Sequence, residues 1–424
     1  MRKRLIGYIL AGMFGGLAAC SQSTGNLHPE HEALAKAMAA GDIHAIRAAV
    51  EITQQKMGSA AGVPEVPDTF KVVPAEAKRM SSEEARRGFS RHFEKLERRR
   101  WWRIGADPAE MRHPLREVAS VVVGNVAAIR ANLEGAEQSL VLATESAEFL
   151  IWAQAQAGAG CYPFPAARSA SPGRAMSAAA RFLERAEKNG NRGSVVRNGW
   201  VYEDLGDGGL QFDNGECGVA MFELYDLTGE KRYLDSGCRA ADWASTRPLC
   251  ANWNYNSFSV RLLARAHRNT GRLEYLDAAI DKARKGVLPG QITKGTYAGR
   301  WFDPHNARPA YHYIMMCALA ELAAVLPPTH AHRPEIMRAL LLGLKARNSE
   351  IVDRGVMNQE SALEALLIVQ QSFAGDAGFL TSTKTWEALR AITLLVCSEA
   401  RSEKPALSPG VWGRLLEHLS QSGD

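Results

Sequence analysis

The sequence shows no large excess of charge of either sign, no CxxC pair and no series of apolar runs long enough to span a membrane. Its 51 basic and 46 acidic residues leave a net charge of +5, which excludes a strong general attraction to nucleic acid. The missing CxxC argues against a zinc ribbon or a dithiol redox site. What the chain does have is an ordinary globular composition, with 46% hydrophobic residues among 424, and this is enough for a large core.

The first twenty residues contain no acidic residue. A positive segment, Arg2-Lys3-Arg4, precedes an apolar stretch from Leu5 to Leu17 that is too short for a comfortable membrane span. This order of charge and apolar residues is the pattern of an export signal. The alternative is an anchor helix that stays attached to the chain.

The end of this stretch, Leu17-Ala18-Ala19-Cys20, resembles the lipobox of bacterial lipoproteins. The resemblance implies cleavage before Cys20 and acylation of its thiol. Ser21 in the next position resembles the sorting pattern for the outer membrane. We therefore expect residues 1–19 to be a lipoprotein signal peptide and residues 20–27 a tether. The protein would be held in the bacterial cell envelope by its lipid, facing the periplasm.

Export to an oxidising compartment permits disulfides among the other six cysteines. Cys317 and Cys397 lie inside apolar helical runs, which favours buried thiols at both positions. Cys217 and Cys250 each fall near the start of a helical unit. They are the most plausible disulfide pair.

A helical repeat occupies the middle of the chain. Thr228-Gly229 recurs as Thr270-Gly271, and Tyr233-Leu234-Asp235 recurs at the same offset as Tyr275-Leu276-Asp277. Glycine just past a helix end supplies the left-handed conformation of a C-cap. Each unit therefore predicts a helix, a Thr-Gly turn and a second helix.

Repeated helical hairpins bury their apolar faces by stacking on one another. The first helix of each pair is the more apolar, and the run from Pro309 to Leu326 carries only Glu321 as a formal charge. We expect an all-α fold in which residues 108–424 form an (α/α)6-type toroid, with residues 28–107 as an N-terminal helical extension. A single membrane span over the Pro309 run is the alternative. Asn198-Gly199 between β-forming residues predicts one short β-hairpin.

Three segments rich in polar and aromatic residues precede apolar first helices, over residues 203–217, 252–259 and 300–313. In a ring of parallel inner helices, the loops before those helices emerge on one face. We therefore expect these segments to converge on one rim, where helix N-termini favour negatively charged groups.

The first segment is dense in acids, which suggests general acid–base chemistry. Asp207 and Asp213 are the candidate catalytic residues, because neighbouring glycines let the backbone approach a ligand. The alternative for Asp213 is a helix cap. The acids lack the spacing of an EF-hand, and no HExxH motif occurs, so we expect no metal and no cofactor.

The second segment combines amides with aromatic rings. Amides bond to pairs of sugar hydroxyls and an indole face stacks on a pyranose, so Trp253, Asn254 and Asn256 are candidate substrate-binding residues. The alternative for Asn256 is a helix cap. Tyr255 is a candidate catalytic acid.

The third segment holds the largest variety of reactive side chains. Arginine binds carboxylates, and histidine takes protons near neutral pH. His305 is the candidate base and Arg308 the candidate catalytic arginine. Tyr311 and Tyr313 are expected to be core aromatics. The candidate substrate-binding residues of this segment are Arg300, Trp301 and Asn306.

The hairpin period, Phe212-Asp213-Asn214-Gly215 at the start of an apolar helix, and Thr228-Gly229 followed by Tyr233-Leu234 resemble the six-hairpin glycosidase-like superfamily over about residues 110–400. That superfamily includes unsaturated glucuronyl hydrolases, sugar epimerases and several polysaccharide lyases. Resemblance to the hydrolases implies an Asp pair, for which Asp207 and Asp213 are the candidates. Resemblance to the lyases implies a carboxylate neutraliser with a histidine or tyrosine, which the second and third segments contain.

The sequence thus predicts a carbohydrate-active enzyme for acidic oligosaccharides, with β-elimination favoured over hydrolysis. In a lyase, Arg308 and the asparagines of the second segment would neutralise the uronate carboxylate and His305 would remove the C5 proton. Asp213 or Tyr255 would be the acid. Two alternatives stay open: a glycoside hydrolase that uses the Asp pair, and a noncatalytic lipoprotein that binds a glycan or a protein.

Overall fold

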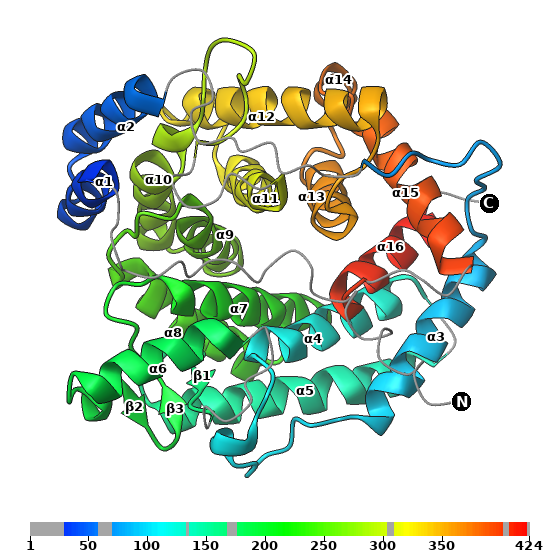
Figure 1. Ribbon diagram of the computed structural model, residues 1–424. Helices are drawn as coiled ribbons and strands as arrows, with labels where there is room; N and C mark the ends of the chain where they lie inside the picture. Colours follow the sequence, from blue (N-terminus) through cyan, green and yellow to red (C-terminus); the bar gives the residue numbers. More distant parts are fainter. Residues whose placement is uncertain are drawn as a thin grey trace, which may run out of the picture.

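The computed structural model describes residues 29–57, 70–132, 135–167, 176–302, 309–401 and 407–421. Over these residues the protein is a closed ring of helical hairpins, as predicted, with an inner and an outer layer (Figure 1). The inner helices are α4 (Leu115–Arg130), α7 (Gly209–Thr228), α9 (Trp253–Thr270), α11 (Pro309–Val325), α13 (Gln359–Ser372) and α16 (Pro409–Gln421). The outer helices are α5 (Ala136–Ala157), α8 (Lys231–Thr246), α10 (Leu273–Gly286), α12 (Arg333–Arg354), α15 (Thr385–Arg401) and α3 (Ser82–Arg98).

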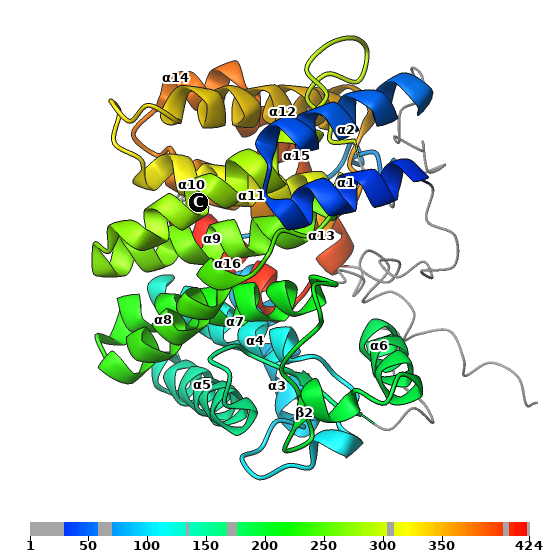
Figure 2. The same ribbon diagram turned by 90° about the vertical axis from the view of Figure 1, so that its left-hand side faces the viewer.

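The remaining elements lie outside the ring or in its connections. Helices α1 (Pro29–Ala40) and α2 (Ile43–Met57) form a hairpin outside the ring beside α10 (Figure 2). The predicted extension over residues 28–107 contains this hairpin and also α3, which belongs to the outer layer of the ring and packs on α16. The connections contain α6 (Ser177–Lys188), α14 (Ala377–Ser382), η2 (Pro108–Glu110), η4 (Arg192–Ser194) and η5 (Leu288–Gly290).

The predicted β-hairpin is confirmed and belongs to a three-stranded sheet. β2 (Val196–Arg197) pairs antiparallel with β3 (Trp200–Val201), and β1 (Phe164–Pro165) pairs with the other edge of β3. Asn198 and Gly199 have φ values of 49° and 78°, and positive φ at both central residues is what a tight two-residue hairpin turn requires.

The repeat is built as the sequence predicts. Gly229 and Gly271 end α7 and α9 with φ of 70°, and their amides donate to the carbonyls of Tyr225 and His267 at 2.8 Å. Each cap returns the chain into the outer helix of its hairpin, so successive inner helices run in the same direction. Their N-termini therefore share one rim of the ring.

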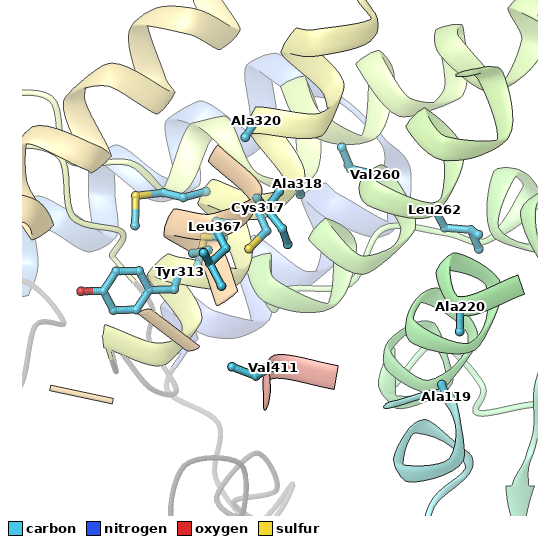
Figure 3. Packing of buried hydrophobic residues seen from close by; sticks show 14 of the residues in the cluster. Ala119, Ala220, Val260, Leu262, Tyr313, Cys317, Ala318, Ala320, Leu367 and Val411 are labelled. Carbon is cyan, nitrogen blue, oxygen red and sulfur yellow. The ribbon is translucent and has the colours of Figure 1, made fainter. Parts of the chain in front are cut away.

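The inner helices form the buried layer. Tyr311 and Tyr313 of α11 are core residues, as expected, and Figure 3 shows Cys317 of α11 and Leu367 of α13 within the main apolar cluster. Among the residues that the structure describes, no helix is long and apolar enough to cross a membrane.

The disulfide prediction is wrong. Cys217 is a free thiol inside the main apolar cluster. Cys250 belongs to a different cluster with Tyr255 and Phe258, and its Sγ lies 3.4 Å from the Asn252 carbonyl. The two thiols do not pair, because each packs in a different apolar cluster even though both lie near the start of an inner helix. Cys317 and Cys397 are buried, as predicted.

Candidate active site

The three segments meet at the rim where the inner helices begin. The indole nitrogen of Trp253 donates to the Phe302 carbonyl at 2.6 Å, which joins the second segment to the third. Ser259 Oγ donates to Gln211 Oε1 at 2.7 Å, which joins the second to the first. The contacts link the starts of α7 and α9 to the chain that enters α11.

Several acids of the first segment shape the loop before α7. Asp204 accepts the Leu210 amide at 2.9 Å, and Arg247 bonds to Asp204 at 3.1 Å and to Glu203 at 2.6 Å. Asp207 is exposed and lies 3.6 Å from Arg185 of α6. Much of the acid density that the sequence displays therefore organises the loop.

Asp213 is fully buried and ties α7 to the first turn of α4. Its carboxylate accepts the Arg116 amide at 3.1 Å and the Arg116 guanidinium at 2.6 Å. Burial raises the pKa of Asp213, and Arg116 opposes that rise. Arg116 also lies 4.4 Å from the centre of the Phe212 ring. The Phe212 ring stacks on Phe258, with 4.1 Å between the ring centres.

The second segment lies at the start of α9, and its candidates differ in how they are held. Trp253 is fully buried, and Tyr255 packs with Phe258 and Cys250. The Asn256 amide bonds to the backbone of Cys250 and Gly286, so it braces the loop before α9 against the end of α10.

Asn254 stands apart in this segment. Its side chain is almost completely buried, yet its Oδ1 has no hydrogen-bond partner among the residues that the structure describes. A buried amide oxygen without a partner is costly for a fold to maintain. Asn254 is therefore a candidate for contact with a ligand.

The third segment is described only in part. Trp301 is fully buried and donates to the Val287 carbonyl at 3.0 Å. Arg300 bonds to Glu350 of α12 at 2.8 Å. The predicted base His305, the predicted catalytic Arg308 and the candidate Asn306 lie outside the described residues, as does the predicted lipidation site Cys20.

Two carboxylates that the sequence analysis did not select lie inside the ring. Nη1 of Arg261 on α9 is 3.4 Å from Glu216 of α7 and 3.4 Å from Glu364 of α13. Helix α11 separates α9 from α13, so a guanidinium that reaches both carboxylates must project into the ring interior (Figure 1). The Nε of Arg261 bonds to Glu321 of α11 at 3.1 Å.

Glu216 and Glu364 remain accessible despite their place on inner helices. Their side chains are 27% and 29% exposed. Burial raises the pKa of Glu216 to about 7, with Arg261 opposing the rise and Glu364 adding to it. A carboxyl group with this pKa both donates and accepts protons at neutral pH. The pair is therefore suited to acid–base chemistry.

Deeper in the ring, the carboxylates of the ion pairs are almost completely buried. Glu223 of α7 bonds to Arg265 at 3.1 Å and Arg414 at 3.0 Å, and also to Arg130. Burial opposes ionisation of Glu321, yet Arg265 and Arg261 lower its pKa to about 2. The sequence carries a signal for this network, because Glu216 and Glu223 are two turns apart and therefore lie on one face of α7.

A pocket of about 460 Å³ lies at the opposite rim, where the inner helices end. Arg265 and Glu321 form part of its wall, together with residues from the ends of α9, α11 and α13. No group of three His, Cys, Asp or Glu side chains that could hold a metal ion occurs within the described ranges.

Comparison with protein-family models and with curated proteins finds no match. Among solved structures, the chain is similar to a polysaccharide lyase, with a TM-score of 0.49 and 12% identity over 80% of this chain and 97% of that one. It is also similar to a glycosyl hydrolase of family 88 from Bacteroides vulgatus, with a TM-score of 0.45 and 11% identity over 81% of this chain and 99% of that one.

Proposed function

We propose that this protein is a carbohydrate-active enzyme that cleaves a glycosidic bond inside the helical ring, with Glu216 as the proton donor and Glu364 as the second carboxylate. One observation carries the proposal: both side chains contact the same nitrogen of Arg261 and both remain accessible to solvent. Two carboxyl groups on either side of the scissile bond are the set that most glycoside hydrolases use.

The two carboxyl groups differ in their surroundings, which favours different roles. The pKa of Glu216 near 7 leaves a large fraction protonated at neutral pH, as a general acid requires. Each carboxylate oxygen lies 3.4 Å from Arg261 Nη1, so the two oxygens are at most twice that distance apart. This limit of about 6.8 Å includes the separation of about 5–5.5 Å found in retaining enzymes and reaches only the lower edge of the range of about 6.5–9.5 Å found in inverting ones.

In the retaining reaction, Glu216 gives its proton to the leaving-group oxygen as the bond from that oxygen to the anomeric carbon breaks. The Glu364 carboxylate forms a bond to the same carbon. A water molecule then displaces Glu364 and loses a proton to Glu216. Both carboxyl groups return to their starting states, and the water oxygen stays on the sugar.

β-Elimination on an acidic saccharide is the second candidate. The buried, unpartnered Oδ1 of Asn254 is an acceptor that would take a hydrogen bond from a sugar hydroxyl. Arg308 and the amide nitrogen of Asn254 would hold the uronate carboxylate while His305 removes the C5 proton. The electron pair of that C–H bond forms the C4–C5 double bond, the C4–O bond breaks, and the leaving oxygen takes a proton from Tyr255. We also propose that the protein acts in the bacterial cell envelope, held by a lipid on Cys20.

The experiment is an assay of the full chain on a panel of neutral and uronate saccharides, recording new reducing ends and ultraviolet absorbance. Hydrolysis gives reducing ends without absorbance, and we expect Glu216→Gln and Glu364→Gln each to lower kcat/KM about 10²-fold or more. Glu274→Gln on α10, where the side chain is 76% exposed, is the matched control.

Other outcomes identify the alternatives. Absorbance that disappears in His305→Ala and Arg308→Ala would establish the lyase. Hydrolysis that survives in both Glu variants and disappears in Asp207→Asn or Asp213→Asn would assign the reaction to the Asp pair. Binding without turnover across the panel would contradict both enzyme proposals and favour a noncatalytic glycan-binding protein.

A further inference from the structure

We propose that Arg261 is a positioning residue that holds Glu216 and Glu364 as an electrostatically coupled pair. The inference deepens the proposed function and depends on it for its catalytic meaning. The electrostatic coupling between the side chains is measurable without a substrate. An experiment can therefore contradict the coupling and the proposed reaction independently of each other.

The Arg261 guanidinium is held in place by an ion pair at a nitrogen other than Nη1, the nitrogen that Glu216 and Glu364 share. Its Nε bonds to Glu321 at 3.1 Å, and Glu321 is itself held by Arg265 Nη2 at 2.9 Å. A guanidinium is planar and donates in fixed directions. With Nε held by Glu321, Nη1 is left to reach Glu216 and Glu364, each at 3.4 Å.

The surroundings of Glu216 predict how its titration responds to each partner. Arg261 and Arg414 are the positive groups that act on it, and Glu364 and Glu321 are the negative ones. On its own helix, Asp213 is paired with Arg116 and Glu223 with three arginines. Removing a nearby positive charge raises the pKa of a carboxyl group, and removing a nearby negative charge lowers it.

The test is a carbon-13 NMR titration of glutamate side-chain carboxyls in the full chain, with the Glu216 signal assigned by its loss in Glu216→Gln. We expect Arg261→Gln to raise the midpoint of Glu216 by about one pH unit or more, and Glu364→Gln to lower it by a similar amount. Arg261→Lys keeps the positive charge without the planar donor fork, so its shift should be smaller than that of Arg261→Gln.

A purely structural arginine would reduce stability without these opposite shifts. If Arg261→Gln does not fold, Arg261→Lys and Glu364→Gln still decide the inference, because the latter replaces a partly exposed carboxylate with an amide of similar shape. Unchanged midpoints, or shifts in the same direction, would overturn it.

The role of Arg261 in catalysis is tested by steady-state kinetics on whichever saccharide the protein cleaves. Arg261→Lys should lower kcat at least tenfold with KM changed less than about threefold, because the residue aligns groups that act in the transition state. A change confined to KM would overturn the positioning role. Opposite NMR shifts without turnover on any saccharide would support the coupled pair and overturn only the proposed reaction.

Discussion

Gly124 of α4 and Gly413 of α16 face each other where the first and last inner helices meet. A Cβ on Gly413 would lie 2.4 Å from the Gly124 carbonyl oxygen, and a Cβ on Gly124 would lie 2.4 Å from the Pro409 carbonyl oxygen. Neither glycine has a positive φ. Glycine is therefore needed here for the close approach of two backbones, and this approach closes the ring.

Gly124→Ala should destabilise the protein by about 1–3 kcal/mol, because the new methyl group forces α4 and α16 apart. Urea unfolding measures the loss. Gly375→Ala is the control, because a Cβ there meets nothing within 4 Å, and we expect a change below about 0.5 kcal/mol. Equal losses in the two variants would show that the close approach is not what the ring requires.

Glu223→Gln should destabilise the protein by about 3–5 kcal/mol, because it leaves the buried Arg265 and Arg414 and the partly exposed Arg130 without their common partner. Asp235→Asn breaks an exposed pair with Lys231 and should cost less than about 1 kcal/mol. Chemical denaturation at neutral pH compares them. A Glu223 variant as stable as the Asp235 variant would contradict a structural role for the ionic interior.

Glu216→Gln should become more stable relative to the natural chain as the pH rises. The folded protein holds the Glu216 proton up to about pH 7, whereas the unfolded chain releases it near 4.5. The folded state therefore binds more protons between these values, and the natural chain loses stability as pH rises through them. Unfolding free energies at pH 4 and pH 8 should reveal a relative gain on the order of 1–3 kcal/mol for the variant. A difference independent of pH would refute the raised pKa.

Hydrolysis should retain the anomeric configuration, because two carboxylate oxygens that contact one nitrogen of Arg261 are at most about 6.8 Å apart, and only the upper edge of that range reaches the spacing of an inverting enzyme. Proton NMR of the first product formed, before mutarotation, distinguishes the two anomers. An inverted product would exclude Glu364 as the nucleophile.

Cys20→Ser should abolish acylation and leave the protein soluble or unprocessed, because the thiol is the predicted attachment point. Acyl labelling and membrane fractionation test this outcome, and Ser21→Ala, which keeps the thiol, should remain lipidated. Unchanged labelling of the Cys20 variant would reject the lipobox.

The secondary structure could be predicted from local sequence signals. The Thr-Gly repeats predicted the ends of α7 and α9, and Asn198-Gly199 predicted the hairpin, because both turns depend on residues that tolerate positive φ. The alternation of apolar and polar helices then predicted two layers, since an apolar helix must be covered. These predictions depend only on interactions between residues that are close together in the sequence.

The site residues could not be predicted from local sequence signals. Asp213 looks reactive beside its glycine, but Arg116 lies nearly a hundred residues earlier and holds its carboxylate. In the sequence, Glu216 is one of several acids in the same segment. Its candidacy as a proton donor depends on its contact with Arg261, which also contacts Glu364, and these two residues come from two other helices.

The amino-acid sequence by itself determined the all-α class, the helical-hairpin repeat and the two-layered ring, because caps, turns and apolar periodicity act over a few residues. Only the tertiary structure decided which charges are paired, which carboxyl groups face the interior and which thiols stay apart. The physical reason is that pKa and accessibility depend on groups brought together by ring closure. The backbone contact of Gly124 with Gly413 and the side-chain contact of Arg261 with Glu364 both arise between residues far apart in the chain.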